Sequence, residues 1–190
     1  MLIAISGGIG AGKSVVSEVL RVMGYAVFDC DAEARDIMDS DPDLHAMLCR
    51  DIHPKAVASG RVDRALISQV VFGDSSKLAA LNALVHGAVF RRLALWRQHH
   101  PGVAFVECAI LHTSGLARMV DAEWRVTAPA DVRVERVKRR SGLSDEQILA
   151  RIQAQAAEEG ADSLHVRIID NSPDAAILPQ IESLIIDSYS

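Results

Sequence analysis

The chain has few cysteines, and their spacing excludes two common kinds of structure. Cys30, Cys49 and Cys108 are the only three in 190 residues. An odd number at such wide intervals supports neither a disulfide framework nor a C-x-x-C metal site. The seven histidines likewise lack the H-E-x-x-H spacing of a zinc site. We therefore expect a protein of a reducing, cytoplasmic compartment.

Excess positive charge and long apolar runs are also missing. The formal net charge is −5 and the one basic cluster is Lys138-Arg139-Arg140, so nucleic acid is not expected as a partner. No segment approaches the roughly 20 apolar residues that cross a bilayer, and no basic region precedes the first apolar stretch. We expect neither membrane insertion nor secretion. The 49% hydrophobic content suits one α/β domain, which we expect to be a monomer.

A phosphate-binding motif stands near the amino end. Residues 7–14 read G-G-I-G-A-G-K-S, which matches G-x-x-x-x-G-K-[ST], and they directly follow an apolar run at 2–5. A strand, a glycine-rich loop and a helix opening at Lys13 present backbone N–H groups that wrap nucleotide phosphates. Lys13 would reach the outer phosphates, and the Ser14 hydroxyl would ligate Mg²⁺. The expected ligands are ATP and Mg²⁺, and the residues predicted to contact the nucleotide are Gly8, Ile9, Gly10, Ala11, Gly12, Lys13, Ser14 and Val15.

Two other nucleotide-binding classes are disfavoured. The dinucleotide pattern G-x-G-x-x-G fails because Lys13 occupies the place of the third glycine. No N-K-x-D element is present to read guanine, which argues against a switch GTPase.

The pattern of short apolar runs predicts a parallel sheet wrapped by helices. Such runs alternate with helical patterns, and they lie at 2–5, 25–28, 103–107, 123–127 and 166–169. The helix from Lys13 is expected to end at Gly24, and Trp96 and Trp124 are expected in the core. Ligands should lie at the carboxyl ends of the strands. The fold class is therefore α/β, a three-layer P-loop kinase fold with a five-stranded parallel sheet.

Two helical excursions interrupt this sheet. Residues 31–100 lack the strand rhythm and show helical patterns, notably at 63–72 and 76–98, so we interpret them as an acceptor-binding insertion into a core made of 1–30 and 101–190. A second helical stretch covers 130–157. Within it, Ser144 and Gln147 form a capping box after a hinge at 141–143, which is typical of a mobile lid at about 137–157. A C-terminal helix is expected at 174–188.

Two carboxylates follow the second predicted strand. Asp29 and Asp31 are two residues apart, so they would share one face at its carboxyl end. One of them would deprotonate an attacking hydroxyl and the other would hold the water shell of the metal. Alternatively, Asp31 caps the next helix.

The remaining candidates each have a structural alternative. Arg139 or Arg140 would close over the transferring phosphoryl group, or would end a helix in solvent. Glu107 would sit near the metal or cap its strand end. Arg64 and His86, in the insertion, would grip the second substrate, or are surface residues.

With these residues in view, the chain resembles the dephospho-CoA kinase family over most of its length. The resemblance rests on the phosphate loop with Ser6, on Asp29-Cys30-Asp31-Ala32-Glu33-Ala34-Arg35 (D-A-D-x-x-A-R), on Gly60-Arg61-Val62-Asp63-Arg64 (G-x-L-D-R), on Arg140-Ser141-Gly142-Leu143-Ser144-Asp145-Glu146-Gln147 followed by Arg151, Ile152 and Gln155, and on Ile169-Asp170-Asn171. The resemblance implies that ATP phosphorylates the ribose 3′-hydroxyl of dephospho-CoA to give coenzyme A. It implies Asp31 as the catalytic base, and we take Lys13 and Arg140 as its partners in catalysis.

The chain also departs from the family pattern. Cys108-Ala109-Ile110-Leu111-His112 stands for P-L-L-F-E, so His112 replaces an expected carboxylate, and Gly87, Ser141 and His165-Val166 also differ. None of these changes touches the phosphate loop or Asp31. Two alternatives stay open at this point: another P-loop kinase acting on a nucleotide or sugar alcohol, and a catalytically weak ATP-binding module.

Overall fold

The structure is a computed structural model that describes residues 1–142, 144–155 and 165–188. The chain forms two compact units. The first contains Met1–Phe28 and His100–Ser190, and the second contains Asp29–His99. Each unit is built around its own packed elements, and the phosphate loop belongs to the first.

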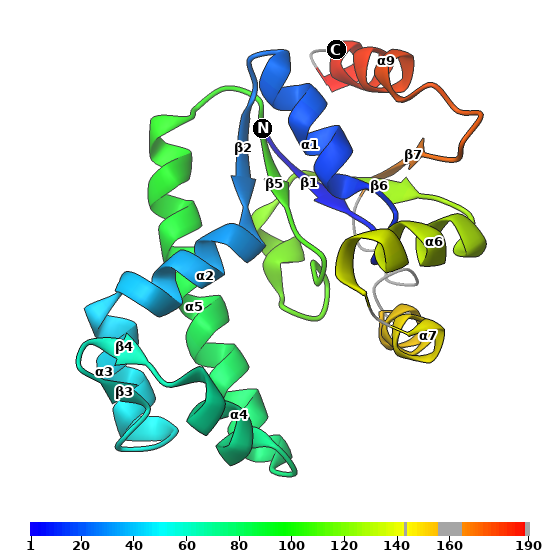
Figure 1. Ribbon diagram of the computed structural model, residues 1–190. Coiled ribbons are helices and arrows are strands. Elements are labelled where there is room, and N and C mark those ends of the chain that lie inside the picture. Colours follow the sequence, from blue (N-terminus) through cyan, green and yellow to red (C-terminus); the bar gives the residue numbers. More distant parts are fainter. Residues whose placement is uncertain (143, 156–164, 189–190) are drawn as a thin grey trace. The chain divides into compact units, whose positions relative to one another are not determined.

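A five-stranded sheet carries the first unit. Its strands lie in the order β2 (Ala26–Asp29), β5 (Ala104–Glu107), β1 (Leu2–Ser6), β6 (Ala122–Thr127) and β7 (Val166–Asp170) (Figure 1). β1 pairs in parallel with both β5 and β6, and β6 pairs in parallel with β7. The predicted fold class and all five predicted strands are therefore confirmed.

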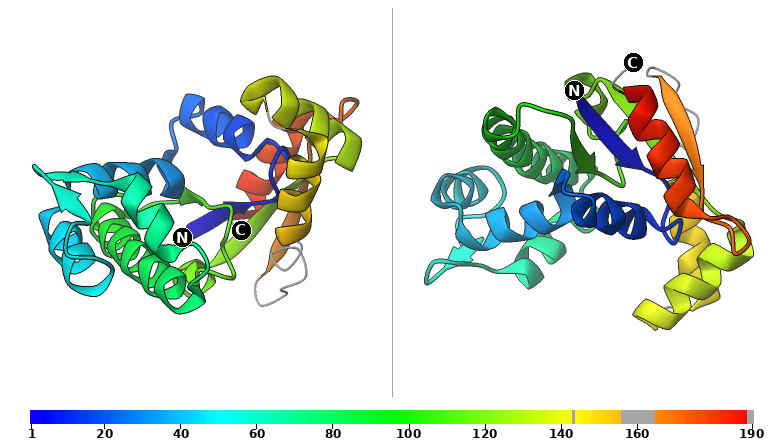
Figure 2. Two further views of the ribbon diagram at one scale, coloured as in Figure 1. Left: turned by 60° about the horizontal axis from the view of Figure 1, so that its bottom comes forward. Right: turned by 90° about the horizontal axis from the view of Figure 1, so that it is seen from above.

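The main core lies between this sheet and two helices. α1 (Lys13–Val22) and α9 (Ile177–Ser188) contact each other on one face of the sheet (Figures 1 and 2). Their buried residues pack on alternate residues of the central strands, and the cluster includes Val16, Leu20, Ile181, Ile185, Ile3, Ile5, Phe105, Trp124 and Val126. Trp124 is 2% exposed, as expected of a core residue, whereas Trp96 is only partly buried. Burial of this apolar face ties both helices to the sheet.

α1 begins and ends at glycines. Gly12 occupies the N-cap position with φ of 101°, and Gly24 follows the C-cap with φ of 91°. Only glycine adopts such left-handed angles without steric cost. The predicted end of the helix is confirmed.

Two further helices continue the first unit after β6. α6 (Ala130–Ser141) ends at Gly142, and α7 (Asp145–Ala154) begins at the predicted capping box, with Ser144 and Gln147 bonded reciprocally. The capping box is thus confirmed. Residues 143 and 156–157 of the predicted lid lie outside the described residues. That the segment moves as a lid stays a prediction.

The second unit is mainly helical. Its elements are α2 (Cys30–Ser40), α3 (Pro42–Asp51), β3 (Val57–Ala58), β4 (Arg61–Val62), α4 (Arg64–Val71) and α5 (Ser75–His99). β3 and β4 form a hairpin that the sequence pattern did not predict. Strands of two residues are too short to produce a detectable alternation of apolar and polar side chains. The turn between them has φ of 51° at Ser59 and 74° at Gly60.

α5 corrects one expectation about apolar runs. By length and composition alone, this 25-residue helix could cross a membrane. A single such helix is weak evidence for a membrane span, because core helices meet the same test. α5 contacts α2, α3 and α4, and its Arg92 pairs with Glu33 at 3.0 Å and with Asp36 of α2.

Candidate nucleotide-binding site

The phosphate loop is held in a conformation that only glycine allows at its first residue. Gly7 has φ of 131°, and a Cβ there would lie 2.3 Å from the carbonyl oxygen of Val126. β6 therefore approaches the loop too closely for any side chain. Lys13 Nζ donates to the carbonyl oxygen of Gly7 at 2.7 Å, which places the lysine over its own loop.

The amino end of α1 is open to an anion. Among the residues that the structure describes, no side chain caps it, and no acidic residue lies in its first turn. Its first N–H groups and the positive end of the helix dipole are the usual receptor of a phosphate group. Ser14, in the same turn, is exposed. This geometry suits a nucleotide whose phosphates rest on residues 8–15.

Side chains from distant parts of the chain brace the loop from outside. Arg133 Nε in α6 donates to the carbonyl oxygen of Ile9 at 2.9 Å, and Gln155 Oε1 accepts from the N–H of Ile9 at 2.7 Å. Asn171 Nδ2, just after β7, donates to the carbonyl oxygen of Ala11 at 2.7 Å. These bonds fix two carbonyl groups of the loop and the N–H group of Ile9.

Arg136 places a cation beside the loop. Its Nη2 donates to the carbonyl oxygen of Asn171 at 3.0 Å. Its Nη1 is buried and makes no hydrogen bond within the part of the chain that the structure describes. That nitrogen lies 3.8 Å from the point where a Cβ on Gly12 would stand. A buried guanidinium nitrogen needs an acceptor, and an anionic ligand at the start of α1 would supply one.

The donor set at the loop fits Mg²⁺ held mainly by phosphates. Among the described residues, no group of three or more histidine, cysteine, aspartate or glutamate side chains can hold a metal. Mg²⁺ commonly takes one or two protein oxygens together with phosphate oxygens and water. Ser14 offers a hydroxyl at the loop. Glu107 ends β5 beside β1, and its Oε2 accepts from Ser17 Oγ of α1 at 2.7 Å, so its carboxylate is oriented by that helix.

The basic cluster at the end of α6 faces solvent. Arg140 is exposed in the last turn. Arg139 pairs with Glu135, one turn earlier, and Lys138 Nζ lies 2.5 Å from a carboxylate oxygen of Asp145 in α7. Of the three, Arg140 is left with its head group in solvent, where it could meet a ligand.

The aspartate pair lies in the second unit and differs from the prediction. Asp29 ends β2, whereas Asp31 already belongs to α2, so the two do not share the face of one strand. Asp29 is also the N-cap, because its Oδ1 accepts from the N–H of Ala32 at 2.9 Å. The alternative that Asp31 caps the helix is therefore wrong. Asp31 is exposed in the first turn of α2.

The other two predicted substrate residues also lie in the second unit. Arg64, the first residue of α4, pairs with Asp39 of α2 at 2.7 Å. His86 stacks on Phe90 in α5, and partial burial lowers its pKa below the ordinary value. Each has a structural contact of its own, and their contact with a substrate stays a prediction.

Sequence reasoning from spacing missed Arg133 and Arg136. A usable signal exists: Arg133, Arg136 and Arg140 are three and four residues apart and so lie along one side of a helix. Gln155 and Asn171 entered only as parts of the family resemblance. Arg133 and Gly7 also line a pocket of about 290 Å³ on the described part of the chain, together with Arg125, Val126, Thr127, Ala128 and Ile168.

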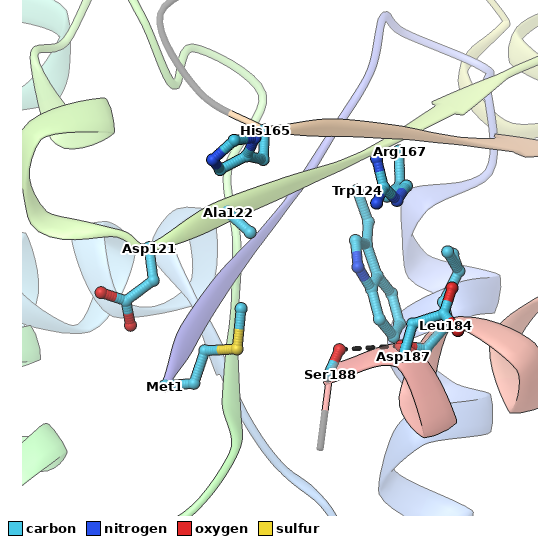
Figure 3. Close-up of a pocket in the computed structure, with 9 residues that line it drawn as sticks. All are labelled: Met1, Asp121, Ala122, Trp124, His165, Arg167, Leu184, Asp187 and Ser188. Carbon is cyan, nitrogen blue, oxygen red and sulfur yellow. Dashed lines mark hydrogen bonds between the residues drawn. The ribbon is translucent and has the colours of Figure 1, made fainter. Parts of the chain in front are cut away.

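A second pocket, of about 200 Å³, lies near the amino ends of β1, β6 and β7. Figure 3 shows Asp121 and His165 on one side of it and Trp124 beside Arg167, with Asp187 near the end of α9. Asp121 Oδ2 accepts from the N–H of Leu2 at 2.6 Å, at the amino end of β1. The phosphate loop follows the carboxyl end of β1, so this pocket is remote from the nucleotide site.

The fold and the site together define a class. A parallel sheet whose central strand leads through a G-x-x-x-x-G-K-S loop into an uncapped helix is the arrangement of the P-loop nucleotide-binding proteins.

Comparison with known proteins gives the family. The dephospho-CoA kinase family model matches residues 1–176, and the chain belongs to this family. A dephospho-CoA kinase of Bacteroides fragilis is 35% identical over 98% of this chain and 92% of its own length. One from Thermus thermophilus is 38% identical over 90% and 83%. The crystal structure of TT1252 from Thermus thermophilus superposes with a TM-score of 0.79 at 34% identity, covering 100% of this chain and 96% of that one.

Proposed function

We propose that this protein phosphorylates the ribose 3′-hydroxyl of dephospho-CoA with ATP. The hydroxyl oxygen attacks the γ-phosphorus, its proton passes to a carboxylate, and the bond to the β–γ bridging oxygen breaks, so that coenzyme A and ADP form. The observation that carries the proposal is the open amino end of α1, directly after the phosphate loop, in a chain that matches the family over residues 1–176.

Residues of the first unit would bind the phosphate donor, ATP. Residues 8–15 would surround the phosphates and hold them through backbone N–H groups other than those of Ile9, Ala11 and Val15, which bond within the protein. Lys13 would leave the carbonyl oxygen of Gly7 and neutralise the outer phosphates, and Arg136 would direct Nη1 to the same ligand. Ser14 would hold Mg²⁺, which when bound offsets charge on the β- and γ-phosphates.

The acceptor side would be formed by residues of the second unit, with Arg140 of the first. Asp31 would take the proton of the hydroxyl, because its exposed carboxylate makes no hydrogen bond or ion pair with the residues that the structure describes, whereas Asp29 is engaged as a helix cap. Arg140 would close over the transferring group and stabilise its charge. Asp29, Arg64 and His86 remain candidates for holding the acceptor. We further propose a cytoplasmic monomer.

The test is an acceptor panel with the purified protein. With Mg·ATP, dephospho-CoA should yield coenzyme A and ADP, while nucleosides and sugar alcohols should yield much less ADP. Asp31→Asn should abolish turnover and leave the calorimetric affinity for Mg·ATP unchanged, because only proton transfer is lost.

Asp43→Asn is the matched control. Asp43 also lies in the first turn of a helix, α3, and is exposed, so the same chemical change there should leave turnover intact. Robust activity of Asp31→Asn would refute the role of Asp31. Preference for another acceptor would refute the substrate.

A further inference from the structure

A buried carboxylate lies next to the phosphate loop and has no part in the function described above. Glu123 in β6 is 0% exposed. Its Oε1 accepts from Ser6 Oγ at 2.5 Å and from Arg125 Nε at 2.8 Å. His112 Nε2 lies 2.9 Å from its Oε2. Both oxygens of this carboxylate are therefore engaged by side chains that are themselves almost buried.

This cluster occupies the face of the sheet away from α1. Side chains alternate along a strand, and Trp124 points into the core beneath α1. Glu123 and Arg125 must then point to the other face. In the parallel register Ser6 stands beside Arg125, and so it can reach Glu123 on that same face.

The cluster joins the segments that follow β1 and β5, the two neighbouring strands whose connections leave in opposite directions. From β1 the chain leaves toward β2, and from β5 it leaves toward β6, on the other side of β1. Ligands of open α/β sheets bind outside the carboxyl ends of strands where the connections diverge in this way. The phosphate loop follows β1 directly after Ser6. Segment 108–115, which contains His112, follows β5.

Stability alone does not account for charges at this place. Taking a carboxylate and a guanidinium out of water is costly, and apolar side chains of similar volume usually stabilise a core as well or better. Hydrogen bonds, in contrast, have a direction and a narrow range of length, so they fix the distance between the groups they join.

We propose that Glu123 is a positioning residue for phosphoryl transfer, because it holds Ser6 and His112 on one carboxylate and so fixes segment 108–115 relative to the phosphate loop. The role rests on the proposed function, since it concerns the alignment of an acceptor with the γ-phosphoryl group. A misalignment of about 1 Å between reacting groups can cost on the order of 100-fold in rate. Nucleotide affinity depends on the loop itself and should change little.

The test uses three variants of the full-length protein. His112→Leu removes the donor to Glu123, and His112→Gln keeps an N–H group that can reach the carboxylate. We expect His112→Leu to lower kcat with dephospho-CoA by about tenfold or more while the KM for ATP changes by less than about twofold. His112→Gln should restore most of kcat. Leu116→Ala, in the 3₁₀ helix after the segment, is the control, because Leu116 is buried in the same region and takes no part in the hydrogen bonds to Glu123.

A second measurement does not depend on the acceptor. Cys108 is 4% exposed at the start of segment 108–115, so release of the segment should speed its labelling by a thiol reagent, followed by peptide mass spectrometry. We expect about tenfold faster labelling in His112→Leu than in the parent protein. Unchanged kcat, unchanged labelling, or an equal loss of kcat in Leu116→Ala would overturn the positioning role. An inactive parent protein would overturn the proposed function instead.

Discussion

Replacing Gly10 by alanine tests whether close packing of α6 against the phosphate loop shapes the nucleotide site. Gly10 has φ of 78°, and an added Cβ would lie 2.6 Å from the carbonyl oxygen of Arg133. Backbone atoms of a helix cannot move aside as a flexible side chain can, so the loop itself must shift. The N–H groups that hold the phosphates would shift with it.

Gly24→Ala provides a matched control. Gly24 also has a left-handed φ, of 91°, but nothing lies within 4 Å of its added Cβ. Both variants should lose about 1–2 kcal/mol of folding free energy from the left-handed conformation. At about 2–4 °C per kcal/mol for a chain of this size, Tm should fall by roughly 2–8 °C in the control. Gly10→Ala should fall further, because the contact with Arg133 adds to this cost.

Calorimetric titration with Mg·ATP separates the two effects. We expect Gly24→Ala to bind Mg·ATP as tightly as the parent protein does, because position 24 lies at the end of α1 away from the phosphate loop. Gly10→Ala should bind at least about tenfold more weakly, which corresponds to about 1.4 kcal/mol. Equal affinity in the two variants would show that the loop accommodates a side chain at position 10, and would refute the reasoning from packing.

Three further predictions concern stability. Burial raises the pKa of Glu123, but the hydrogen bonds from Arg125 and Ser6, the charge of Arg125 and the contact with His112 outweigh it and hold the pKa below the ordinary 4.5. The ionised carboxylate therefore contributes stability that is present above pH 4.5 and lost as pH falls below it, and urea unfolding at pH 7 and pH 4 should show a loss that disappears in Glu123→Gln. Trp124→Ala, whose ring packs 4.9 Å from that of Phe105, should cost about 3–5 kcal/mol of unfolding free energy; a loss under about 1 kcal/mol would contradict its place in the core. Ser144→Ala should cost about 1 kcal/mol, confined to α7, so hydrogen exchange should quicken there and not in α1.

The parts of the fold that the sequence predicted well depend on local patterns of residues. The phosphate loop, the end of α1 at Gly24 and the capping box of α7 each depend on residues within a few positions of one another. Local patterns are less informative where one residue decides the outcome. The spacing of the two aspartates predicted a common strand face, whereas the chain turns into α2 between them and Asp29 is the N-cap. Helix boundaries depend on such single hydrogen bonds, and propensity does not resolve them.

β6 shows why the Glu123 cluster could not be predicted. Its residues Ala-Glu-Trp-Arg-Val-Thr alternate between apolar and polar side chains, a pattern typical of a strand with one face in solvent. In the structure both faces are covered, and Glu123 is 0% exposed. Its partners Ser6 and His112 lie 117 and 11 residues away along the chain, so their meeting depends on strand order.

The sequence by itself determined the chemistry of the phosphate loop, because a G-x-x-x-x-G-K-S segment between a strand and a helix carries its own backbone geometry and charge. It also determined the fold class, because the spacing of apolar runs sets which segments become strands. Only the tertiary structure decided what surrounds the loop. Arg133, Arg136 and Asn171 lie more than 100 residues from Ile9 and Ala11, and parallel pairing of distant strands brings them together. Contacts of that range follow from the packing of the whole unit, which no local pattern encodes.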